Sequence, residues 1–288
     1  MIHENVEKAK KQGGGCPSQA SQEDKQKKQE QMIRNNLSRI KNKLVVLSGK
    51  GGVGKSSVSV NLAACLAAKG FKTGLMDVDL HGPSIGHMLG MNDLLDMSEN
   101  QMLLPKRVSE NFTAVSIQGL MQDRDQAVIW RGPAKTGMIQ QFVGSVEWGD
   151  LDFLIIDAPP GTGDEPISVV QTIKDAKGII VTTPQEVALA DIRKSISFCN
   201  TVKMDIVGII ENMSSYRCPH CNEPVDLFKT GGGKATAEKS GVNFLGAIPF
   251  DTEVVRSGDS GEPLMLNKSD SQFAEAFNTI VDNITSRL

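Results

Sequence analysis

The stretch SGKGGVGKSS, residues 48–57, contains the complete G-x-x-x-x-G-K-[ST] pattern between Gly49 and Ser56. It follows the apolar run KLVVL and precedes SSVSVNLAACLAAKG, a helical segment with Gly70 as its expected stop. A glycine-rich turn between a buried strand and a helix lets backbone N–H groups face phosphate oxygens, and the helix N-terminus adds partial positive charge. The stretch therefore predicts a nucleotide phosphate site on an α/β fold.

The residues of this phosphate loop have distinct expected roles. Lys55 is placed to reach the β- and γ-phosphates, and the Ser56 hydroxyl to bind Mg²⁺. An ordinary phosphate loop does not need Lys50, and the simplest explanation is that Lys50 is a solvated surface residue without a role in the site. The predicted nucleotide-binding residues of the loop are Gly49, Lys50, Gly51, Gly52, Val53, Gly54, Lys55, Ser56 and Ser57.

From Leu44 onward, short apolar runs alternate with segments of helical length. Most of the runs are continuously apolar, as expected for strands that are covered on both faces. Helical segments between them, such as EVALADIRKSISFCNTV, favour right-handed crossovers. We therefore predict a three-layer α/β P-loop NTPase fold in residues 44–288, with a mainly parallel central sheet flanked by helices. The strand candidates are KLVVLS, KTGLMDVD, TAVSI, LDFLIID, GIIVTT, DIVGIIEN and NFLGAIP.

Residues 1–43 differ in composition from the rest of the chain. They contain ten Lys or Arg and five Asp or Glu, whereas the whole chain has a net charge of −3. We predict a mobile basic N-terminal arm that contains a helix, with a weak apolar stripe of Met32, Ile33, Leu37 and Ile40. A basic arm could contact nucleic acid or acidic lipid, but it has no aromatic residue for stacking on bases, which favours a solvated tail.

Cysteine usage and hydropathy favour a cytoplasmic protein. Five cysteines, an odd number, are scattered over 288 residues and do not form the pattern of a disulfide framework. No apolar run reaches the roughly 18 residues needed to span a bilayer, so stable membrane insertion is not expected. The N-terminus is charged and then glycine-rich, unlike a secretory signal.

Two further apolar runs end in carboxylates. LMDVDLHGPS carries Asp77 and Asp79, and FLIIDAPPGTGD carries Asp157. The carboxyl ends of strands in such sheets face the ligand crevice. Asp157 fits a Walker B pattern, whose carboxylate holds Mg²⁺ through water, and Gly161 and Asp164 follow where a loop can approach and sense the γ-phosphate. A lone Asp at a strand end is often only a helix cap, but three such segments in this order favour a nucleotide site.

The K-G-G-x-G-K-[ST] form of the loop resembles the deviant Walker A group of ATPases, which includes MinD, ParA, the nitrogenase iron protein and the Mrp carriers. In that group the additional lysine, here Lys50, reaches phosphates that the partner subunit binds, so the resemblance implies an ATP-dependent homodimer. The resemblance also places Asp77 near the Mg²⁺ shell and implies that Asp79 orients or deprotonates the attacking water. The expected catalytic residues are then Lys50, Lys55 and Asp79.

Within that group the chain resembles the Mrp (ApbC) family of iron–sulfur carrier ATPases. The matching segments are SGKGGVGKSSVSVNLA, DVDLHGPSI, WRGP, LIIDAPPGTGDE, ENMSSYRCPHC and GAIPFD. The resemblance implies that Asn212 contacts the adenine ring of ATP and that Pro249 and Phe250 pack near the same base. It also implies an ATPase that receives a cluster from a donor and passes it to apoproteins.

Cys218 and Cys221 have C-x-x-C spacing, which suits half of a metal site or a redox couple. A [4Fe–4S] cluster is usually held by four thiolates, and the chain has no second C-x-x-C. Since a two-fold axis doubles any nearby pair, we predict that two copies share one exposed [4Fe–4S] cluster at the dimer axis. A zinc knuckle across the same axis is the alternative.

The remaining cysteines are not expected to bind this cluster. Cys65 and Cys199 lie on apolar helical faces and are predicted core residues. Cys16 is alone in the N-terminal arm, whereas eukaryotic relatives in the family carry four cysteines there. One thiolate cannot hold a stable cluster, so no second permanent cluster is expected.

Two other functions fit parts of the sequence. A MinD- or ParA-like positioning ATPase would need an adhesive surface, but the apolar C-terminal segment SQFAEAFNTIVDNITSRL has one basic residue and suits a packed helix better than a membrane anchor. A thiol–disulfide oxidoreductase is suggested by C-P-H-C, but such enzymes place the motif at a helix start. Here a turn and Pro224 follow the motif.

Overall fold

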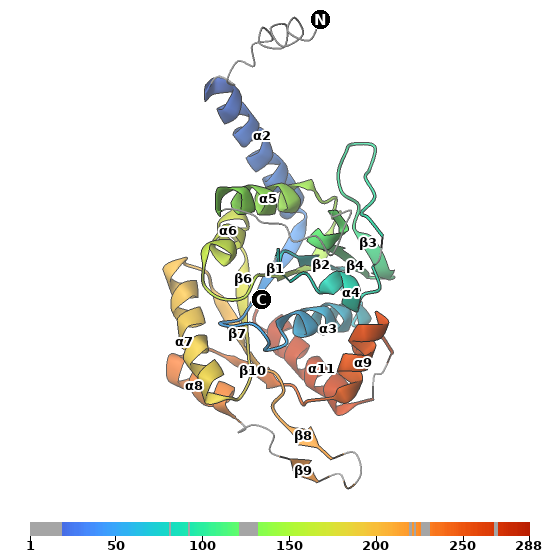
Figure 1. Ribbon diagram of the computed structural model, residues 1–288, viewed down its shortest axis with the longest axis vertical. Helices are drawn as coiled ribbons and strands as arrows, with labels where there is room; N and C mark the ends of the chain where they lie inside the picture. The colour runs from blue at the N-terminus through green and yellow to red at the C-terminus, as the bar shows by residue number, and fades with distance from the viewer. Residues whose placement is uncertain are drawn as a thin grey trace, which may run out of the picture.

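The computed structural model describes residues 19–80, 82–91, 93–120, 132–218, 221, 223–225, 231–267 and 270–288. Its centre is an 8-stranded sheet with the order β10-β7-β6-β1-β5-β2-β4-β3 (Figure 1). Every neighbouring pair is parallel except β3 and β4, which are antiparallel. The strands are β1 (Ile40–Leu47), β2 (Thr73–Asp77), β3 (Lys106–Ser109), β4 (Phe112–Ser116), β5 (Leu151–Asp157), β6 (Lys177–Thr182), β7 (Ile206–Glu211) and β10 (Phe244–Ala247).

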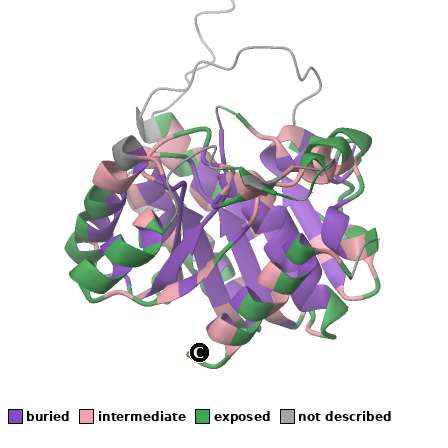
Figure 2. Ribbon diagram, turned by 90° about the horizontal axis from the view of Figure 1, so that it is seen from below, coloured by how far each residue is buried: buried purple, intermediate pink, exposed green. Residues whose placement is uncertain are grey.

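Helices cover both faces of this sheet, which confirms the predicted three-layer α/β fold (Figure 2). Strand residues alternate between the two faces, since Val45 of β1 packs in one core cluster and Val46 in the other. One face carries α2 (Gln19–Ser38), α5 (Gly132–Ser145), α6 (Asp164–Thr172), α7 (Glu186–Thr201) and α8 (Gly232–Ser240). The other carries α3 (Lys55–Ala68), α4 (Ile85–Met88), α9 (Thr252–Ser260), α10 (Leu264–Asn267) and α11 (Gln272–Thr285).

Each of the predicted apolar runs forms a strand of the sheet, but short polar strands were missed. The edge strand β3 has the sequence KRVS and is only partly buried, so it carries no continuous apolar signal. A small hairpin of β8 (Tyr216–Arg217) and β9 (Pro224–Val225) was missed for the same reason. A single turn of 3-10 helix, η1 (Ile117–Leu120), follows β4.

The helix predicted in the N-terminal arm is α2, and its C-terminal part packs on the domain. Ile33 and Leu37 are buried, each 7% exposed, whereas Met32 of the predicted stripe is 46% exposed. The side-chain amide of Asn36 donates to the backbone carbonyl of Gly144 in α5, at 2.7 Å. A Cβ at Gly144 would lie 2.8 Å from Cγ1 of Ile33, so this glycine permits the close contact of α2 with α5.

These contacts correct the predicted boundary between residues 43 and 44. β1 begins at Ile40, and Lys43 lies within the strand with its Nζ 2.7 Å from Oδ2 of Asp175. The boundary was misplaced because residues 40–43 are Ile, Lys, Asn and Lys, and three polar residues in succession do not resemble a buried run. The mobility of the arm stays a prediction, since residues 1–18 lie outside the described part of the chain.

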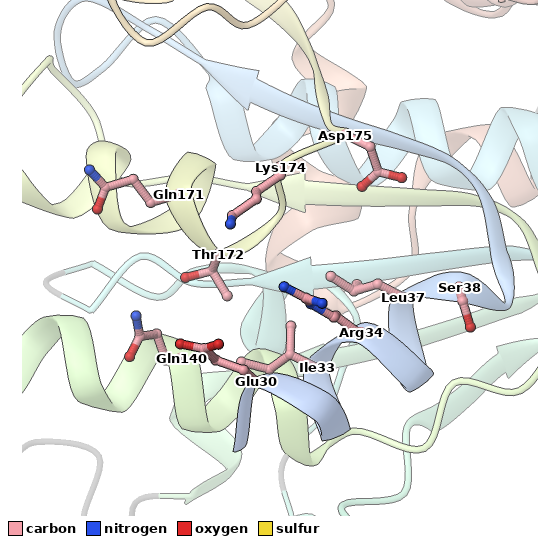
Figure 3. Close-up of a pocket in the computed structure, with 10 residues that line it drawn as sticks. All are labelled: Glu30, Ile33, Arg34, Leu37, Ser38, Gln140, Gln171, Thr172, Lys174 and Asp175. Carbon is pink, nitrogen blue, oxygen red and sulfur yellow. The ribbon is translucent and has the colours of Figure 1, made fainter. Parts of the chain in front are cut away.

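A groove remains between α2, α5 and the segment after α6 (Figure 3). Its volume is about 400 Å³. Glu30 of α2 lies beside Gln140 of α5, and Gln171, Thr172 and Lys174 line the other side, while Ile33 and Leu37 of α2 add apolar surface. None of its lining residues belongs to the phosphate loop, so its size does not make it the candidate active site.

The C-terminal helix α11 is a core element, as its sequence predicted. Phe273, Phe277 and Ile280 are each at most 3% exposed, and Phe273 and Phe277 are in ring contact. None of the described helices combines the length and the apolar character that a membrane span requires.

Candidate functional site

The phosphate loop connects β1 to α3 at the carboxyl edge of the sheet. Gly52 and Gly54 both have φ of +80°, a backbone conformation that residues with a side chain rarely adopt. Gly54 is also the N-cap of α3, so Lys55 is the first residue of that helix. The loop thus presents the N-terminus of α3, which has partial positive charge and unsatisfied N–H groups that suit an anion.

Asp157 links the side chains expected to contact phosphate and Mg²⁺. Its Oδ2 lies 2.7 Å from Nζ of Lys55, and this ion pair is almost fully enclosed, with side chains 6% and 1% exposed. The hydroxyl of Ser56 donates to the same Oδ2 at 2.6 Å, and the hydroxyl of Ser59 donates to Oδ1 at 2.7 Å. Lys55 is therefore paired with Asp157, and a phosphate that binds Lys55 must compete with this carboxylate.

Asp77 lies at the end of β2, beside Asp157 in the sheet register. Its Oδ2 accepts hydrogen bonds from the Ser116 hydroxyl at 2.9 Å and from the backbone N–H of Ile85, and its Oδ1 accepts from that of Asp79. Burial and then the Asp157 carboxylate raise the pKa of Asp77 to about 7, against the lowering effect of its N–H and hydroxyl donors. Asp77 therefore secures the loop after β2 and is not joined directly to Ser56.

Asp79 lies closer to the phosphate loop. Its Oδ2 is 3.8 Å from Nζ of Lys55, and its Oδ1 accepts from the backbone N–H of Gly82. The side chain is 9% exposed. This position, beside the expected γ-phosphate-binding lysine, suits a group that orients water.

The loop after β5 approaches the phosphate loop through Gly161. Its backbone N–H donates to the carbonyl of Ser48 at 2.8 Å, and its φ is +91°. Asp164 begins α6 and is exposed, and Lys50 is half-buried at the other end of the phosphate loop. The segments predicted for phosphate sensing therefore lie next to each other, although their residues are far apart in the chain.

A cavity of about 250 Å³ opens beside the phosphate loop. It contains the three residues assigned to the base, Asn212, Pro249 and Phe250, together with Gly54 and Ser57 of the loop. Its walls are largely apolar, formed in part by α9 and α11, which suits the faces of a purine ring. The structure thus brings the predicted base contacts and the predicted phosphate contacts into one continuous site.

The two cysteines of the C-x-x-C motif lie on the β8–β9 hairpin, which projects from the body of the protein (Figure 1). Cys218 is half-buried and Cys221 is exposed. The backbone N–H of Cys218 donates to the carbonyl of Glu223 at 2.9 Å and closes the loop that holds both thiols. Two accessible thiols on a projecting hairpin can reach a ligand shared with another molecule.

Cys65 and Cys199 are buried, which confirms that they are core residues. Desolvation raises the pKa of Cys65 to about 11 and that of Cys199 to about 12, so both thiols stay protonated and are poor metal ligands. Cys16, Trp130 of the WRGP segment and His220 lie outside the described residues.

Sequence reasoning missed three polar residues of this site. Ser59 bonds to Asp157, Ser116 bonds to Asp77, and the buried Glu211 accepts hydrogen bonds from the backbone N–H groups of Gly231 and Gly233. Ser59 is four residues after Lys55 on the same face of α3, and Ser116 and Glu211 end the strands β4 and β7. These positions, one helical turn after Lys55 and at the carboxyl ends of two strands, were the sequence signal that could have identified them.

Comparison with known proteins gives concordant matches. A family model described as NUBPL iron-transfer P-loop NTPase, within ParA, matches residues 39–285. The iron-sulfur cluster carrier protein of Methanocaldococcus jannaschii is 46% identical over 277 residues, covering 95% of both chains. The cytosolic Fe-S cluster assembly factor NUBP2 homolog of Dictyostelium discoideum is 46% identical over 252 residues, 86% of this chain and 95% of that protein. The solved nucleotide-binding protein of Archaeoglobus fulgidus, in complex with ADP, has a TM-score of 0.74 at 36% identity, covering 86% of this chain and 96% of that one.

Proposed function

Since the chain belongs to the NUBPL iron-transfer P-loop NTPase family, we propose that it is an ATP-hydrolysing carrier that assembles an iron–sulfur cluster and transfers it to apoproteins. The observation that carries this proposal is the position of the C-x-x-C hairpin. Its two accessible thiols stand on a segment that begins three residues after Met213, which lines the base cavity. A nucleotide site and a metal-binding hairpin are thus built from one stretch of chain.

ATP binding is proposed to use the phosphate loop and the adjacent cavity. Lys55 leaves Asp157 for the β- and γ-phosphates, and Asn212, Pro249 and Phe250 hold the adenine. Asn212 already donates one N–H of its Nδ2 to the carbonyl of Val53 at 2.9 Å, so its Oδ1 can accept a hydrogen bond from the base and its second N–H can donate one to a ring nitrogen. The exocyclic amine of adenine supplies such a donor, whereas guanine has a carbonyl at the equivalent position.

The site fits Mg²⁺, which prefers oxygen ligands and keeps several waters. Ser56 and Asp157 offer a hydroxyl and a carboxylate oxygen that lie 2.6 Å apart. Asp77 would act from further out, because its oxygens already accept hydrogen bonds from Ser116 and two backbone N–H groups. When bound, Mg²⁺ would neutralise phosphate charge, while Asp79 orients the attacking water and Lys50 of a second copy supplies positive charge.

A homodimer with one shared cluster is proposed from the number of thiolates. Within the part of the chain that the structure describes, one pair is accessible, Cys218 and Cys221, and Cys65 and Cys199 are buried in the core. A [4Fe–4S] cluster usually takes four thiolates, which two chains provide together. An exposed cluster at the seam between two copies can be released to an apoprotein. The relative from Dictyostelium is named cytosolic, in agreement with the cytoplasmic location predicted from cysteine usage.

The positioning ATPase is less well supported than the carrier. Both share the phosphate loop, but a positioning ATPase gives no reason for two accessible thiols on a projecting hairpin. The oxidoreductase is also less well supported, because the motif begins in a β-hairpin loop and not at the start of a helix.

The function can be tested by reconstituting the protein anaerobically with iron and sulfide. Visible absorption and metal analysis should show a cluster, and an apoenzyme that needs a [4Fe–4S] cluster should gain activity on mixing. Cys218→Ser and Cys221→Ser should each abolish both signals, whereas Cys16→Ser should retain them. Zinc without a visible chromophore after reconstitution would replace the carrier with a structural zinc site.

A further inference from the structure

The C-x-x-C hairpin and the base cavity share one aromatic wall. Phe250 lines the cavity, and its ring lies edge-on against Tyr216, the first residue of the hairpin, with centroids 5.7 Å apart and an interplanar angle of 79°. We propose that this Phe250–Tyr216 contact positions the cysteine hairpin according to whether a nucleotide base occupies the cavity. The proposal rests on the proposed function in taking Cys218 and Cys221 as cluster ligands.

The incoming strand of the hairpin is held by backbone bonds to the same segment as Phe250. The N–H of Phe250 donates to the carbonyl of Ser215 at 2.7 Å, and the N–H of Ser214 donates to the carbonyl of Ile248 at 2.9 Å. The hydroxyl of Ser214 donates to that carbonyl as well, at 3.1 Å. Hydrogen bonds therefore join residues 248–250 to residues 214–216, so these two segments must move together.

Phe250 borders two hollows. One is the base cavity, and the other, of about 250 Å³, is also lined by Tyr216, Thr252 and Gln272. Both hollows are lined by Phe250 and Phe273. An aromatic ring that borders two hollows lacks the close packing that fixes core side chains, so it can change its tilt. A base that fills the first cavity removes this freedom and holds the ring against Tyr216.

The outgoing end of the hairpin segment is anchored beside the same site. Glu211 is 1% exposed and directly precedes Asn212 in the chain. Its two carboxylate oxygens accept from the N–H groups of Gly231 and Gly233, at 3.2 Å and 2.5 Å, where α8 begins. A Cβ at Gly233 would lie only 2.9 Å from Oε2 of Glu211. Because Glu211 of β7 fixes the C-terminal end of the hairpin segment, a base in the cavity can shift this segment mainly at Tyr216.

Hydrogen exchange at the backbone amide of Cys218 tests this link, because that amide bonds within the hairpin and Cys218 does not line the base cavity. The cluster-free protein is compared alone, with Mg²⁺–ADP, and with Mg²⁺–pyrophosphate, which offers phosphates without a base. ADP is chosen because it lacks the γ-phosphate expected to favour dimers. We expect ADP to slow exchange about fivefold, or about 1 kcal/mol at 1.4 kcal/mol per tenfold, the size of one aromatic pair. Pyrophosphate should not slow it.

Variants separate the aromatic contact from general stabilisation. At saturating ADP, Tyr216→Leu should lose the slowing, and because the link is reciprocal its ADP affinity should fall by at most about fivefold. Tyr216→Phe, which keeps the ring, should retain both the slowing and the affinity. The matched control is Phe71→Leu. Phe71 and Phe153 form an aromatic pair with the same interplanar angle of 79°, but neither lines the base cavity. Phe71→Leu should therefore leave the slowing intact. The proposal is wrong if ADP leaves the wild-type exchange unchanged, or if Tyr216→Leu responds as strongly as wild type. Iron and sulfide analysis of reconstituted wild type tests the cluster site separately, so a failed link and a failed carrier function give different results.

Discussion

The side-chain amide of Asn212 donates a hydrogen bond to the backbone carbonyl of Val53, at 2.9 Å, across 159 residues of sequence. This bond ties the end of β7 to the phosphate loop, and Asn212 is only 8% exposed. It also fixes the orientation of the amide, because a carbonyl can pair only with the nitrogen. Its Oδ1 can then accept a hydrogen bond and its second N–H can donate one, a pair that matches the amine and ring nitrogen of adenine better than the two neighbouring acceptors of guanine.

Asn212→Ala is therefore expected to weaken ATP binding and to reduce the preference for ATP over GTP. The loss of one hydrogen bond to the base should cost about 1 kcal/mol, or roughly fivefold in affinity, with a smaller effect on GTP. Equilibrium binding of both nucleotides measures this. Asn243→Ala is the matched control, because Asn243 also donates its amide to a backbone carbonyl, that of Val207, but does not line the base cavity. Equal losses for ATP and GTP in Asn212→Ala would show that the residue supports the loop without reading the base.

Lys50→Ala should retain most ATP binding and lose hydrolysis. If Lys50 acts on the nucleotide of a second copy, its charge matters mainly in the transition state, and its removal should lower kcat at least about 100-fold. Lys55→Ala is the comparison, because Lys55 serves the phosphates of its own chain and its loss should abolish binding. Binding and steady-state ATPase assays on both variants distinguish these roles. Equal kcat for wild type and Lys50→Ala would rule out a trans-acting lysine.

Some features of the nucleotide site could be predicted from short sequence motifs, and others could not. The phosphate loop, Asp79 and Asp157 could be predicted because each stands at a fixed place after an apolar strand. The ion pair of Lys55 with Asp157 could not, since it depends on how β1 and β5 pair in the sheet. The same limit applies to Ser59, whose role becomes visible only when α3 lies over β5.

The N-terminal helix shows a different limit. The sequence of α2 is mostly polar, and its apolar stripe is too weak to predict where the helix packs. Its place on α5 depends on the close approach at Gly144 and on the amide of Asn36, both of which are tertiary contacts. Local pattern therefore predicted the helix but not its attachment.

Asp79→Asn should leave ATP affinity nearly unchanged and lower turnover. The amide keeps the shape of the side chain and its acceptor for the N–H of Gly82, but it cannot take a proton or hold water as strongly. A loss of about 100-fold in kcat is the expected size for a water-orienting base. Binding and turnover are measured on the same preparation. A parallel fall in affinity and rate would instead place Asp79 among the groups that hold the nucleotide.

The buried Asp77 predicts a pH dependence of stability. Its pKa is raised to about 7, above the roughly 3.9 of an unfolded chain. Between these values the native state holds a proton that the unfolded chain has released, so the free energy of unfolding falls as pH rises through this window. The contribution is at most about 1.4 kcal/mol for each pH unit. Asp77→Asn should flatten the fall, as measured by urea unfolding of the nucleotide-free protein at several pH values.

The control for this experiment is Asp150→Asn. Arg39 lowers the pKa of the exposed Asp150, so its contribution changes at a lower pH and has the opposite sign. Asp150→Asn should therefore keep the wild-type slope in the neutral range. If Asp77→Asn also keeps that slope, Asp77 is ionised in the native protein at neutral pH.

A cluster shared between two copies makes a prediction about mixed dimers. Each chain contributes Cys218 and Cys221, so a dimer of one wild-type chain and one chain with both residues changed to Ser retains only two of these thiolates. If a [4Fe–4S] cluster needs about four thiolates, such a mixed dimer should hold almost no iron, whereas the wild-type dimer should hold about four irons and four sulfides. If instead each chain binds its own metal, the mixed dimer should hold half the wild-type amount.

Two different affinity tags on co-expressed chains allow the mixed dimer to be purified anaerobically and reconstituted. The matched control is a mixed dimer with Cys16→Ser in one chain, which should keep the full iron content. Half-occupancy in the Cys218 and Cys221 mixed dimer would refute the shared cluster while leaving cluster binding itself intact.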